Sequence, residues 1–378
     1  KPIYMPKLKI LQVVRQYLPS TGGMETYVAS LCRQLAARGH SCDVATLDYI
    51  FKTNEPLPHY ERIDGIDVIR LPSMGNPRYF FAPRLLRMLP RYDLVHVHGV
   101  DFFVDMLGAF RKAHGTPVVL STHGGFFHTH WFPALKKAYF HSVTRTVLKN
   151  VDRVIASSPQ DQKLFRQVTG NISLVENGID YAYFAAVKKR LSKGKIVYIG
   201  RLSKNKRIDR LLSVMAKVRE SHPRTTLTVV GPDWEGLKAG LEARAAALKV
   251  NGPVTFTGAV SREELLKALA SARLFVSASE YEAFGLSAME AMASGTLPVL
   301  NKIPAFEGFV NDGVNGFLVD FADTDAAAVT VRMALELPDR QLKELGAAAK
   351  GTAALHDWDN IAGSVLNIYS EVCAKHGN

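Results

Sequence analysis

Short apolar runs alternate with longer amphipathic stretches along the first half of the chain. The runs are continuous and rich in Val, Ile and Leu, whereas a strand exposed on one face would place a polar residue at every second position. Continuous runs separated by helical stretches predict parallel strands covered by helices on both faces, which is an open, doubly wound α/β sheet. The predicted strands of this half occupy residues 9–14, 41–47, 93–99, 117–124 and 153–158.

A second series of apolar runs begins after the charged stretch at residues 188–195 and predicts another Rossmann-like sheet. The domains are therefore predicted at residues 1–187 and 188–357. Ligands of open α/β sheets bind beyond the carboxyl ends of the strands, so two such sheets facing each other predict an inter-domain cleft. Residues 358–378 hold a predicted helix that could pack back on the first domain. The strands of the second series are predicted at residues 195–200, 226–231, 254–258, 274–279, 296–300 and 316–319.

Basic residues are concentrated in the first half. The 378 residues carry a net charge of +12, and residues 1–190 account for +11, with 25 Lys and Arg against 14 Asp and Glu. This excess predicts an anionic partner, and charge alone leaves nucleic acid, an acidic bilayer surface and a phosphorylated substrate open. No known nucleic-acid-binding module is visible in the sequence, so nucleic acid is not expected.

The apolar runs and the cysteines predict the cellular compartment. No run reaches the roughly 18 apolar residues of a membrane span, and no secretion signal is visible at the start of the chain. Cys32, Cys42 and Cys373 have no paired spacing, which predicts neither a disulfide framework nor a zinc ribbon. A protein that stays in the reducing cytoplasm is expected.

The strongest chemical signal lies at residues 282–295, which follow a predicted strand and enter a helix. Gly285 permits close backbone approach, and the unpaired amides of the first helical turn form a site suited to a diphosphate. Glu282 precedes this helix and can face a bound sugar, while Glu290, about two turns on, can reach a ribose. The alternative is an amphipathic helix with one solvated glutamate and one favoured by the helix dipole.

Two cations follow the first strand of the second series. Arg201 and Lys206 could neutralise a diphosphate there, and cations that hold a leaving diphosphate more strongly in the transition state speed its departure without a metal. A solvated basic turn is the alternative, because Lys204 and Arg207 are neighbours.

Gly22 and Gly23 follow the first strand as a tight turn whose amides could face phosphates or an acceptor. Without a GxGxxG pattern this turn is not a dinucleotide fingerprint. His123 follows another strand and should lie at the carboxyl edge of the sheet. His96 and His98 alternate on a neighbouring strand; an HxH pair suggests a metal, but no third ligand is identifiable, so a structural or acceptor-side role ranks higher.

Two acidic triplets, at residues 323–325 and 357–359, match the DxD pattern that holds a divalent ion in other sugar-transferring folds. Both precede helical stretches, where aspartates are better explained as N-caps and first-turn partners of the helix dipole. No cofactor and no essential divalent metal are expected.

The acidic motif at residues 282–290 resembles the EX7E motif of retaining glycosyltransferases of family 4, which have the GT-B fold. The resemblance implies transfer of a sugar from a nucleotide donor with retention of anomeric configuration. It covers most of the chain, since further matching motifs lie at residues 22–28, 176–180, 198–209, 290–300 and 311–319.

By this resemblance Glu282 contacts hydroxyls of the donor sugar, Glu290 contacts the ribose, and the amides of Leu286 and Ser287 contact the diphosphate. His123 also contacts the donor sugar and helps to place the anomeric carbon without acting as a base. No base is evident on the acceptor side, which agrees with a front-face route in which the leaving phosphate takes the acceptor proton.

Segments at residues 14–25, 98–105 and 121–131 are similar to the α-1,3-mannosyltransferases of xanthan- and acetan-type bacterial exopolysaccharide assembly. Those enzymes move mannose from GDP-mannose to a cellobiose carried on a polyprenyl diphosphate, at the cytoplasmic membrane face. Such a lipid-linked acceptor would account for the basic first half. The candidate acceptor residues are Gly22, His98, Asp101 and His128.

Basic and aromatic residues are mixed at residues 77–91 and 131–149. Such segments can lie in an anionic headgroup layer, so peripheral association with the inner membrane face is expected; ordinary helices covering the sheet are the alternative. The candidate membrane residues are Arg78, Arg84, Arg87, Trp131, Lys136 and Lys137.

The nucleobase is not readable from spacing, because backbone contacts around Gly258 and Val260 suit guanine or uracil equally. GDP is therefore implied by the resemblance alone. A UDP-sugar-dependent transferase of the same family and a non-catalytic nucleotide-sugar-binding protein stay open as alternatives.

Overall fold

The computed structural model describes residues 6–20, 22–51, 53–76, 79–124, 133–190 and 192–377. It divides into an N-terminal unit, Lys1–Gly178 with Trp358–Asn378, and a C-terminal unit, Ile179–Asp357. The predicted boundary at residues 187/188 therefore comes too late. Ile179 and Phe184 are buried and pack into the C-terminal core with Val197, which assigns this segment to the second unit.

The described residues of the N-terminal unit form an eight-stranded sheet in the order β10-β9-β8-β7-β1-β2-β4-β3. Neighbouring strands are parallel except for β3, which runs antiparallel to β4 at the edge. A separate antiparallel hairpin joins β5 and β6. The strands are β1 (Lys9–Val14), β2 (Ser41–Leu47), β3 (Tyr60–Ile63), β4 (Ile66–Leu71), β5 (Met74–Asn76), β6 (Tyr79–Phe81), β7 (Leu94–His98), β8 (Val118–Ser121), β9 (Arg153–Ala156) and β10 (Ile172–Leu174).

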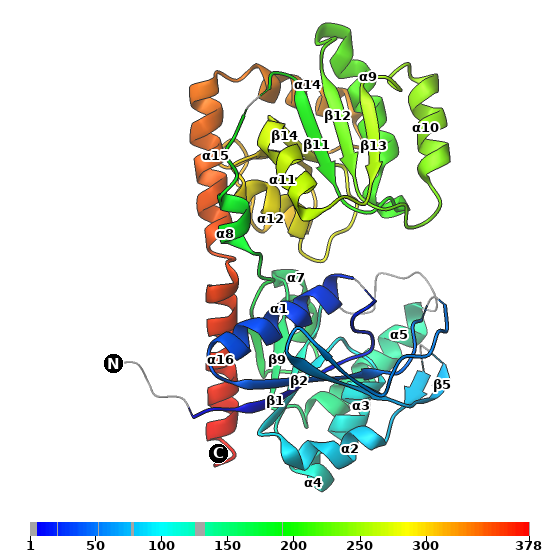
Figure 1. Cartoon of the computed structure of the whole chain (residues 1–378), viewed down its shortest axis with the longest axis vertical. Coiled ribbons are helices and arrows are strands. Elements are labelled where there is room, and N and C mark those ends of the chain that lie inside the picture. Colours follow the sequence, from blue (N-terminus) through cyan, green and yellow to red (C-terminus); the bar gives the residue numbers. More distant parts are fainter. Residues whose placement is uncertain are drawn as a thin grey trace. The chain divides into compact units, whose positions relative to one another are not determined.

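Helices cover both faces of this sheet. On one face α1 and the C-terminal helix α16 lie side by side (Figure 1) and share a core with β1, β2 and β4. On the other face α2, α3, α6 and α7 enclose a second core. The helical segments are α1 (Gly23–Ala37), α2 (Arg84–Met88), η1 (Leu89–Arg91), α3 (Phe102–Ala109), α4 (Arg111–His114), α5 (Pro133–Tyr139), the π-helix η2 (Phe140–Thr144), α6 (Arg145–Leu148), α7 (Pro159–Phe165) and α16 (Trp358–Ala374).

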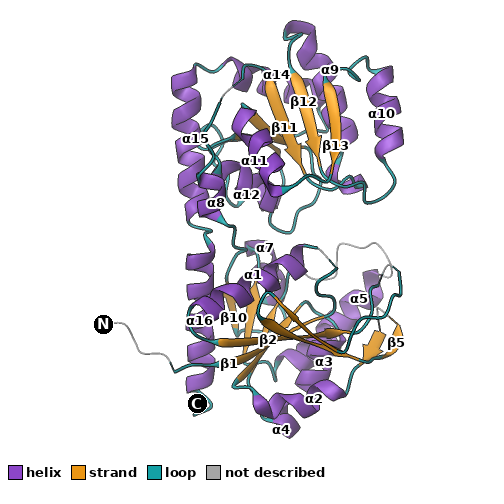
Figure 2. Ribbon diagram, in the orientation of Figure 1, coloured by secondary structure: helices purple, strands orange, loops and turns teal. Residues whose placement is uncertain are grey.

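The C-terminal unit contains a six-stranded sheet in the order β13-β12-β11-β14-β15-β16, and every neighbouring pair is parallel. Each predicted strand of the second series is present in it, and Figure 2 labels β11, β12 and β13. The strands are β11 (Lys195–Ile199), β12 (Thr226–Val230), β13 (Val254–Gly258), β14 (Leu274–Ser277), β15 (Leu297–Asn301) and β16 (Phe317–Val319).

Two cores again lie on the two faces of this sheet, one with α9, α10 and α14, the other with α8, α11, α12 and α15. Burial of continuous Val, Ile and Leu runs on both faces is what a parallel sheet requires. The helical segments are α8 (Tyr181–Ala185), η3 (Lys204–Lys206), α9 (Ile208–Ser221), α10 (Lys238–Ala247), α11 (Arg262–Ser271), α12 (Leu286–Ala293), α13 (Pro304–Glu307), α14 (Thr324–Glu336) and α15 (Asp339–Ala354).

Candidate active site

Lys206 and Glu282 meet at the carboxyl edge of the C-terminal sheet. Lys206 ends the turn η3 after β11, and Glu282 lies in the loop between β14 and α12. The Nζ atom of Lys206 lies 2.5 Å from Glu282 Oε1, and the side chains of Lys206 and Glu282 are only 13% and 18% exposed. The pair is therefore only weakly screened by water. The structure thus brings together two residues that the sequence placed 76 positions apart.

The loops that carry this pair are held together by further contacts. The backbone N–H of Glu280 donates to Asn205 O (2.8 Å), and the Asn205 amide donates to Tyr281 O (3.2 Å). The Glu280 carboxylate pairs with Arg207 (2.6 Å) and Arg210 (2.7 Å). Arg207 and Lys206 are therefore both committed to ion pairs, whereas Arg201, which precedes this basic turn, is exposed.

The start of α12 has the properties of an anion site. Its N-cap is Gly285, in the left-handed region at φ 103°, and no side chain caps the helix. A Cβ at this position would lie 2.7 Å from the Phe306 ring, so glycine is required. The amide of Ala288 donates to Gly285 O, but those of Leu286 and Ser287 have no acceptor among the described residues. These amides can therefore bind an oxyanion.

Glu290 lies further along α12, near Arg262 and Asp180. Burial raises the pKa of its carboxyl group to about 7, Arg262 lowers it, and Asp180 raises it. Arg262 itself pairs with Asp180 at 2.9 Å and lies over the Tyr183 ring at 4.0 Å. Glu290 is thus a partly buried acceptor that titrates near neutral pH, as functional carboxylates often do.

The strand β13 ends at the same edge. Gly258 has φ 74°, and its carbonyl accepts the N–H of Gly231 (2.9 Å), which follows β12. Val260 is half-buried against the neighbouring core. The predicted contacts of Gly258 and Val260 with a nucleobase stay a prediction.

In the N-terminal unit the loop after β8 places His123 at the carboxyl edge. His123 adopts φ 49°, an uncommon conformation for a residue with a side chain, and residues held in this way cluster at functional sites. The Asp161 carboxylate holds the turn by accepting from Thr122 Oγ1 (2.7 Å) and from the Gly124 amide (2.8 Å). The Tyr27 ring packs against His123 edge-on, with centroids 4.8 Å apart.

The three predicted histidines form one group, in which His96 and His98 are buried and His123 is partly exposed. His98 Nδ1 lies 2.9 Å from His123 Nε2, and the ring centroids of His96 and His98 are 4.1 Å apart. Burial lowers the pKa of all three imidazoles, in the case of His123 to about 4, so they are neutral at pH 7. His98 has no exposed surface, so it lies behind His123. It does not lie at an acceptor surface, where the sequence predicted it.

The other predicted residues of this edge have mixed placements. Gly22 is the N-cap of α1, where a Cβ would lie 2.5 Å from the Glu25 carboxylate, and the exposed Gly23 has open space around it. Asp101 caps α3 by accepting the Phe103 amide (2.8 Å) and pairs with Arg15 (3.2 Å). These contacts give Asp101 a structural role that the sequence did not reveal. His128, Arg78 and Trp131 lie outside the described residues.

The first acidic triplet is an N-cap, as predicted. Asp323 accepts the amides of Asp325 (3.1 Å) and Ala326 (3.0 Å) at the start of α14, and Asp325 pairs with Lys217. In the second triplet, Asp359 lies in the first turn of α16 and pairs with Arg38 (2.7 Å). Within the described part of the chain, no group of three His, Cys, Asp or Glu residues could hold a metal ion.

Comparison with known proteins decides the family. Residues 21–183 match the family model "Glycosyltransferase Family 4", and residues 182–352 match "Glycosyl transferases group 1". The GDP-mannose:cellobiosyl-diphosphopolyprenol alpha-mannosyltransferase of Xanthomonas campestris is 32% identical over 366 residues, covering 96% of both chains. This chain belongs to the family 4 glycosyltransferases. An enzyme of the same name from Komagataeibacter xylinus is 33% identical over 97% of this chain and 94% of the relative.

Solved structures confirm the GT-B fold of this glycosyltransferase. Sucrose-phosphate synthase of Thermosynechococcus elongatus superposes with a TM-score of 0.77 at 24% identity, over 98% of this chain and 100% of that one. HepE of Anabaena, solved with UDP and glucose, gives 0.73 at 18% identity, over 96% and 100% of the two chains. Two Rossmann-like units are characteristic of this fold, as the sequence predicted.

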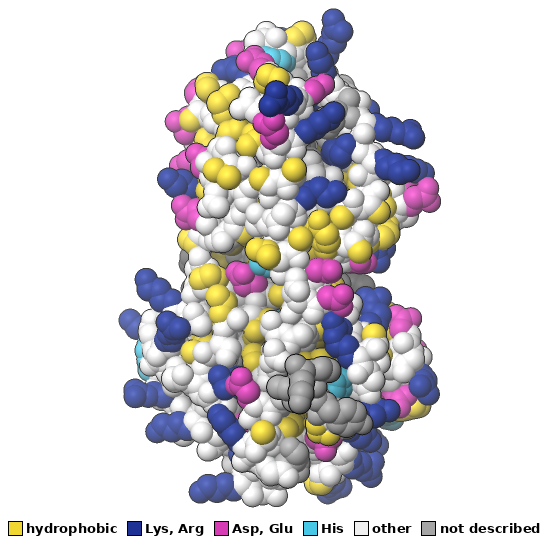
Figure 3. Space-filling model, turned by 90° about the vertical axis from the view of Figure 1, so that its left-hand side faces the viewer, with side chains coloured by type: hydrophobic (Ala, Val, Ile, Leu, Met, Phe, Trp, Pro, Cys, Tyr) yellow, Lys and Arg dark blue, Asp and Glu magenta, His cyan; other side chains and the backbone are white. Residues whose placement is uncertain are grey.

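The basic segments of the glycosyltransferase contribute mainly to its core. Phe80 and Leu85 are buried, which favours the alternative that these segments cover the sheet. The exposed Arg84 and Arg87 form no ion pair with any described residue, Lys137 is exposed, and Lys136 is half-buried. On the face drawn in Figure 3, basic side chains are visible on the N-terminal unit and also on the C-terminal unit. Among the described residues, no helix is long and apolar enough to cross a bilayer.

Proposed function

We propose that this glycosyltransferase moves mannose from GDP-mannose to a cellobiose carried on polyprenyl diphosphate, forming an α-1,3 linkage in bacterial exopolysaccharide biosynthesis. The observation that carries the proposal is the set of three relatives with one name, GDP-mannose:cellobiosyl-diphosphopolyprenol alpha-mannosyltransferase. They are 31 to 33% identical to this chain and align over 96 to 97% of it.

The C-terminal edge supports the donor half of this proposal. The uncapped amides of Leu286 and Ser287, together with Lys206 and Arg201, would hold the diphosphate of GDP. As the bond to mannose breaks, negative charge develops on this diphosphate, and preorganised cations stabilise it without a metal. Glu282 would accept hydroxyls of the mannose. We therefore infer a reaction that needs no divalent ion.

Retention of configuration is the second part of the proposal. His123 is neutral and would hydrogen-bond the donor sugar, while the leaving diphosphate takes the acceptor proton. Asp101 is the acidic acceptor candidate of the N-terminal edge. Its carboxylate already accepts the α3 amide and pairs with Arg15, although burial raises its pKa to about 7. These commitments favour a structural role for Asp101 over that of an inverting base.

The acceptor would be reached at the cytoplasmic face of the membrane. The exposed cations Arg84, Arg87 and Lys137 suit an anionic headgroup layer, where each contributes about 1 kcal/mol. Phe81 (41% exposed) and Leu135 (65% exposed) are apolar side chains in the same segments. Peripheral association would bring a membrane-embedded diphosphate lipid to the N-terminal unit.

The direct test uses GDP-mannose and a short-chain cellobiosyl diphospholipid in the presence of EDTA. We expect an α-linked mannosyl product, identified by mass and by anomeric NMR, and we expect its loss in Glu282→Ala. Glu263→Ala is the matched control, because Glu263 is exposed and pairs only with Lys267 on α11. Reaction with a UDP-sugar in place of GDP-mannose would contradict the proposed donor. Binding of GDP-mannose without turnover would indicate a binding protein.

Affinity for GDP should depend on pH through Glu290. A ribose hydroxyl donates to the carboxylate, and with a pKa of about 7 only about a tenth of this group is ionised at pH 6. GDP should therefore bind more tightly at pH 8 than at pH 6, by up to about tenfold. The stability of the free protein should depend on pH in the opposite direction. The raised pKa of Glu290 favours folding at low pH, and this contribution to the free energy of unfolding is lost as pH rises through 7.

Calorimetric titration of GDP between pH 6 and 8 measures this dependence. Glu290→Gln keeps the shape of the side chain but cannot titrate. The affinity of this variant for GDP should therefore lack the part of the pH dependence that comes from Glu290. The variant also controls for titration of the nucleotide itself. An identical pH dependence in both proteins would show that Glu290 does not bind the ribose as a carboxylate.

A further inference from the structure

A chain of hydrogen bonds runs from His123 into the core of the N-terminal unit. His123 Nε2 lies 2.9 Å from His98 Nδ1, and His98 Nε2 lies 2.7 Å from Gln12 Oε1. The Gln12 amide nitrogen donates to the hydroxyl of Tyr369 (3.3 Å), a residue of α16. Gln12, His98 and Tyr369 have no exposed surface, whereas His123 is partly exposed. The chain therefore opens toward solvent only at His123.

The chain continues beyond Tyr369 to a second buried histidine. The Tyr369 hydroxyl lies 2.6 Å from His96 Nδ1, and His96 Nε2 lies 2.8 Å from Ser121 Oγ. These contacts involve both ring nitrogens of His96. Because the site excludes water, each buried polar group depends on its partner in the chain for a hydrogen bond.

The orientation of the Gln12 amide determines where the protons lie. Its Oε1 can only accept, so His98 carries its proton on Nε2 and presents a bare Nδ1. That Nδ1 must accept, so His123 carries its proton on Nε2. The Nδ1 of His123 is then a bare acceptor, and no described residue hydrogen-bonds to it. The Tyr369 hydroxyl accepts from Gln12 and donates to His96, which completes a consistent set of donors and acceptors.

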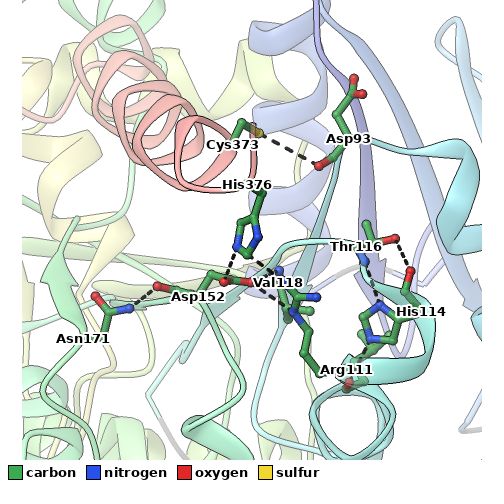
Figure 4. Close-up of polar contacts among 10 residues, drawn as sticks. Asp93, Arg111, His114, Thr116, Val118, Asp152, Asn171, Cys373 and His376 are labelled. Carbon is green, nitrogen blue, oxygen red and sulfur yellow. Dashed lines mark hydrogen bonds and ion pairs between the residues drawn. The ribbon is translucent and has the colours of Figure 1, made fainter. Parts of the chain in front are cut away.

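The turn that follows α16 is anchored to the N-terminal sheet. Figure 4 shows His376 and Arg111 converging on Asp152. His376 Nε2 lies 2.7 Å from Asp152 Oδ1, and Arg111 pairs with the other carboxylate oxygen (3.2 Å). The same oxygen accepts the Val118 amide (2.7 Å) at the start of β8. The C-terminal helix is thus tied to the strand that leads to His123.

We propose that Tyr369 and Gln12 are positioning residues that hold His123 in the tautomer protonated on Nε2, leaving Nδ1 as an acceptor for a hydroxyl of the donor sugar. The consequence for catalysis rests on the proposed role of His123 at that sugar. The tautomer itself is a property of the free protein. A sugar hydroxyl that donates its proton to Nδ1 is held in one orientation. A ring protonated on Nδ1 would instead donate to the hydroxyl oxygen and so reverse this hydrogen bond.

Removal of the Tyr369 hydroxyl tests the chain. In Tyr369→Phe the Gln12 nitrogen loses its acceptor, so the amide can turn and present N–H to His98. His98 and His123 would then shift their protons to Nδ1. We expect long-range ¹H–¹⁵N spectra of ¹⁵N-histidine-labelled protein to show His123 protonated on Nε2 in the parent, and on Nδ1 or in exchange in Tyr369→Phe. The signal that is missing from the spectrum of the His123→Asn variant is that of His123.

Tyr92→Phe is the matched control. Tyr92 is buried in the same unit, and its hydroxyl donates to Asp43 Oδ2 (2.8 Å), away from the histidines. This variant should keep the parent tautomer and turnover. Tyr369→Phe should lose about tenfold in kcat/KM for the donor, the effect of one misdirected hydrogen bond. Gln12→Leu breaks the same chain, so the double variant should be no worse than either single one.

Three results would overturn the proposal: His123 protonated on Nδ1 in the parent protein, an unchanged tautomer in a folded Tyr369→Phe, or additive losses in the double variant. If Tyr369→Phe fails to fold, Gln12→Leu provides the same spectral test. A parent protein with the expected tautomer and no turnover of GDP-mannose would contradict the proposed function and leave the positioning chain intact.

Discussion

Replacing Lys206 by alanine is expected to lower kcat/KM for the sugar donor by about 10²-fold, the usual effect of removing one preorganised group that stabilises developing charge. Lys206 Nζ lies 2.5 Å from Glu282 Oε1 in a poorly solvated pair. The variant would remove a cation from the proposed diphosphate site and leave Glu282 as an uncompensated charge. Steady-state rates with a varied donor concentration measure the loss, and circular dichroism establishes that the variant is folded.

Lys204→Ala is the matched control for this variant. Lys204 lies in the same turn η3, but its side chain is exposed and forms no ion pair with any described residue. It should retain most of the parent activity. Equal losses in the two variants would mean that the general positive potential of the turn matters and that the contact between Lys206 and Glu282 does not.

The strands could be predicted because each parallel strand buries both of its faces. Runs such as residues 9–14 and 195–199 are predominantly apolar, and they form β1 and β11. The strands that were missed lie at or next to sheet edges. β3 is largely exposed, β4 alternates buried and half-exposed residues, and β10 has only three residues, so none gives a continuous run.

The local geometry of the candidate site could be predicted where it depends on short sequence spacing. Glu282, Gly285 and Glu290 lie within one loop and helix, so their motif already determines their geometry. Gln12 and Tyr369 could not be found in this way, because 357 positions separate two residues that share a hydrogen bond. Neither residue is part of a recognisable motif. Only the packing of α16 against the sheet brings them together.

Mixed basic and aromatic segments gave the least reliable prediction. The pattern at residues 77–91 suits a membrane surface and a core-covering helix equally well, because both place apolar and basic residues on opposite sides. The structure shows Phe80, Leu85 and Leu89 in the core, and the described arginines Arg84, Arg87 and Arg91 are exposed. Charge thus remains the main support for membrane contact, and the aromatic residues contribute less than their number suggested.

A close approach of two backbones determines the position of Arg201. After β11 and β12 the chain continues side by side: the amide of Gly200 donates to Val230 O, and that of Leu202 donates to Pro232 O (2.8 Å each). Gly231 lies between these bonds at φ 143°. A Cβ on Gly231 would lie 2.6 Å from the carbonyl carbon of Gly200, closer than real side chains come, so no larger residue fits without separating the two segments.

Gly231→Ala is therefore expected to destabilise the C-terminal unit by about 3 kcal/mol and to weaken GDP binding, because the backbone that carries Arg201 must move. Gly236→Ala separates this effect from simple backbone strain. Gly236 has φ 70° in the following loop, but nothing lies within 4 Å of its Cβ position. Gly236→Ala should therefore destabilise the C-terminal unit by only about 1 kcal/mol. Denaturant unfolding and GDP calorimetry measure both effects. If the two variants behave alike, the close approach to Gly200 is not what places Arg201 for the diphosphate.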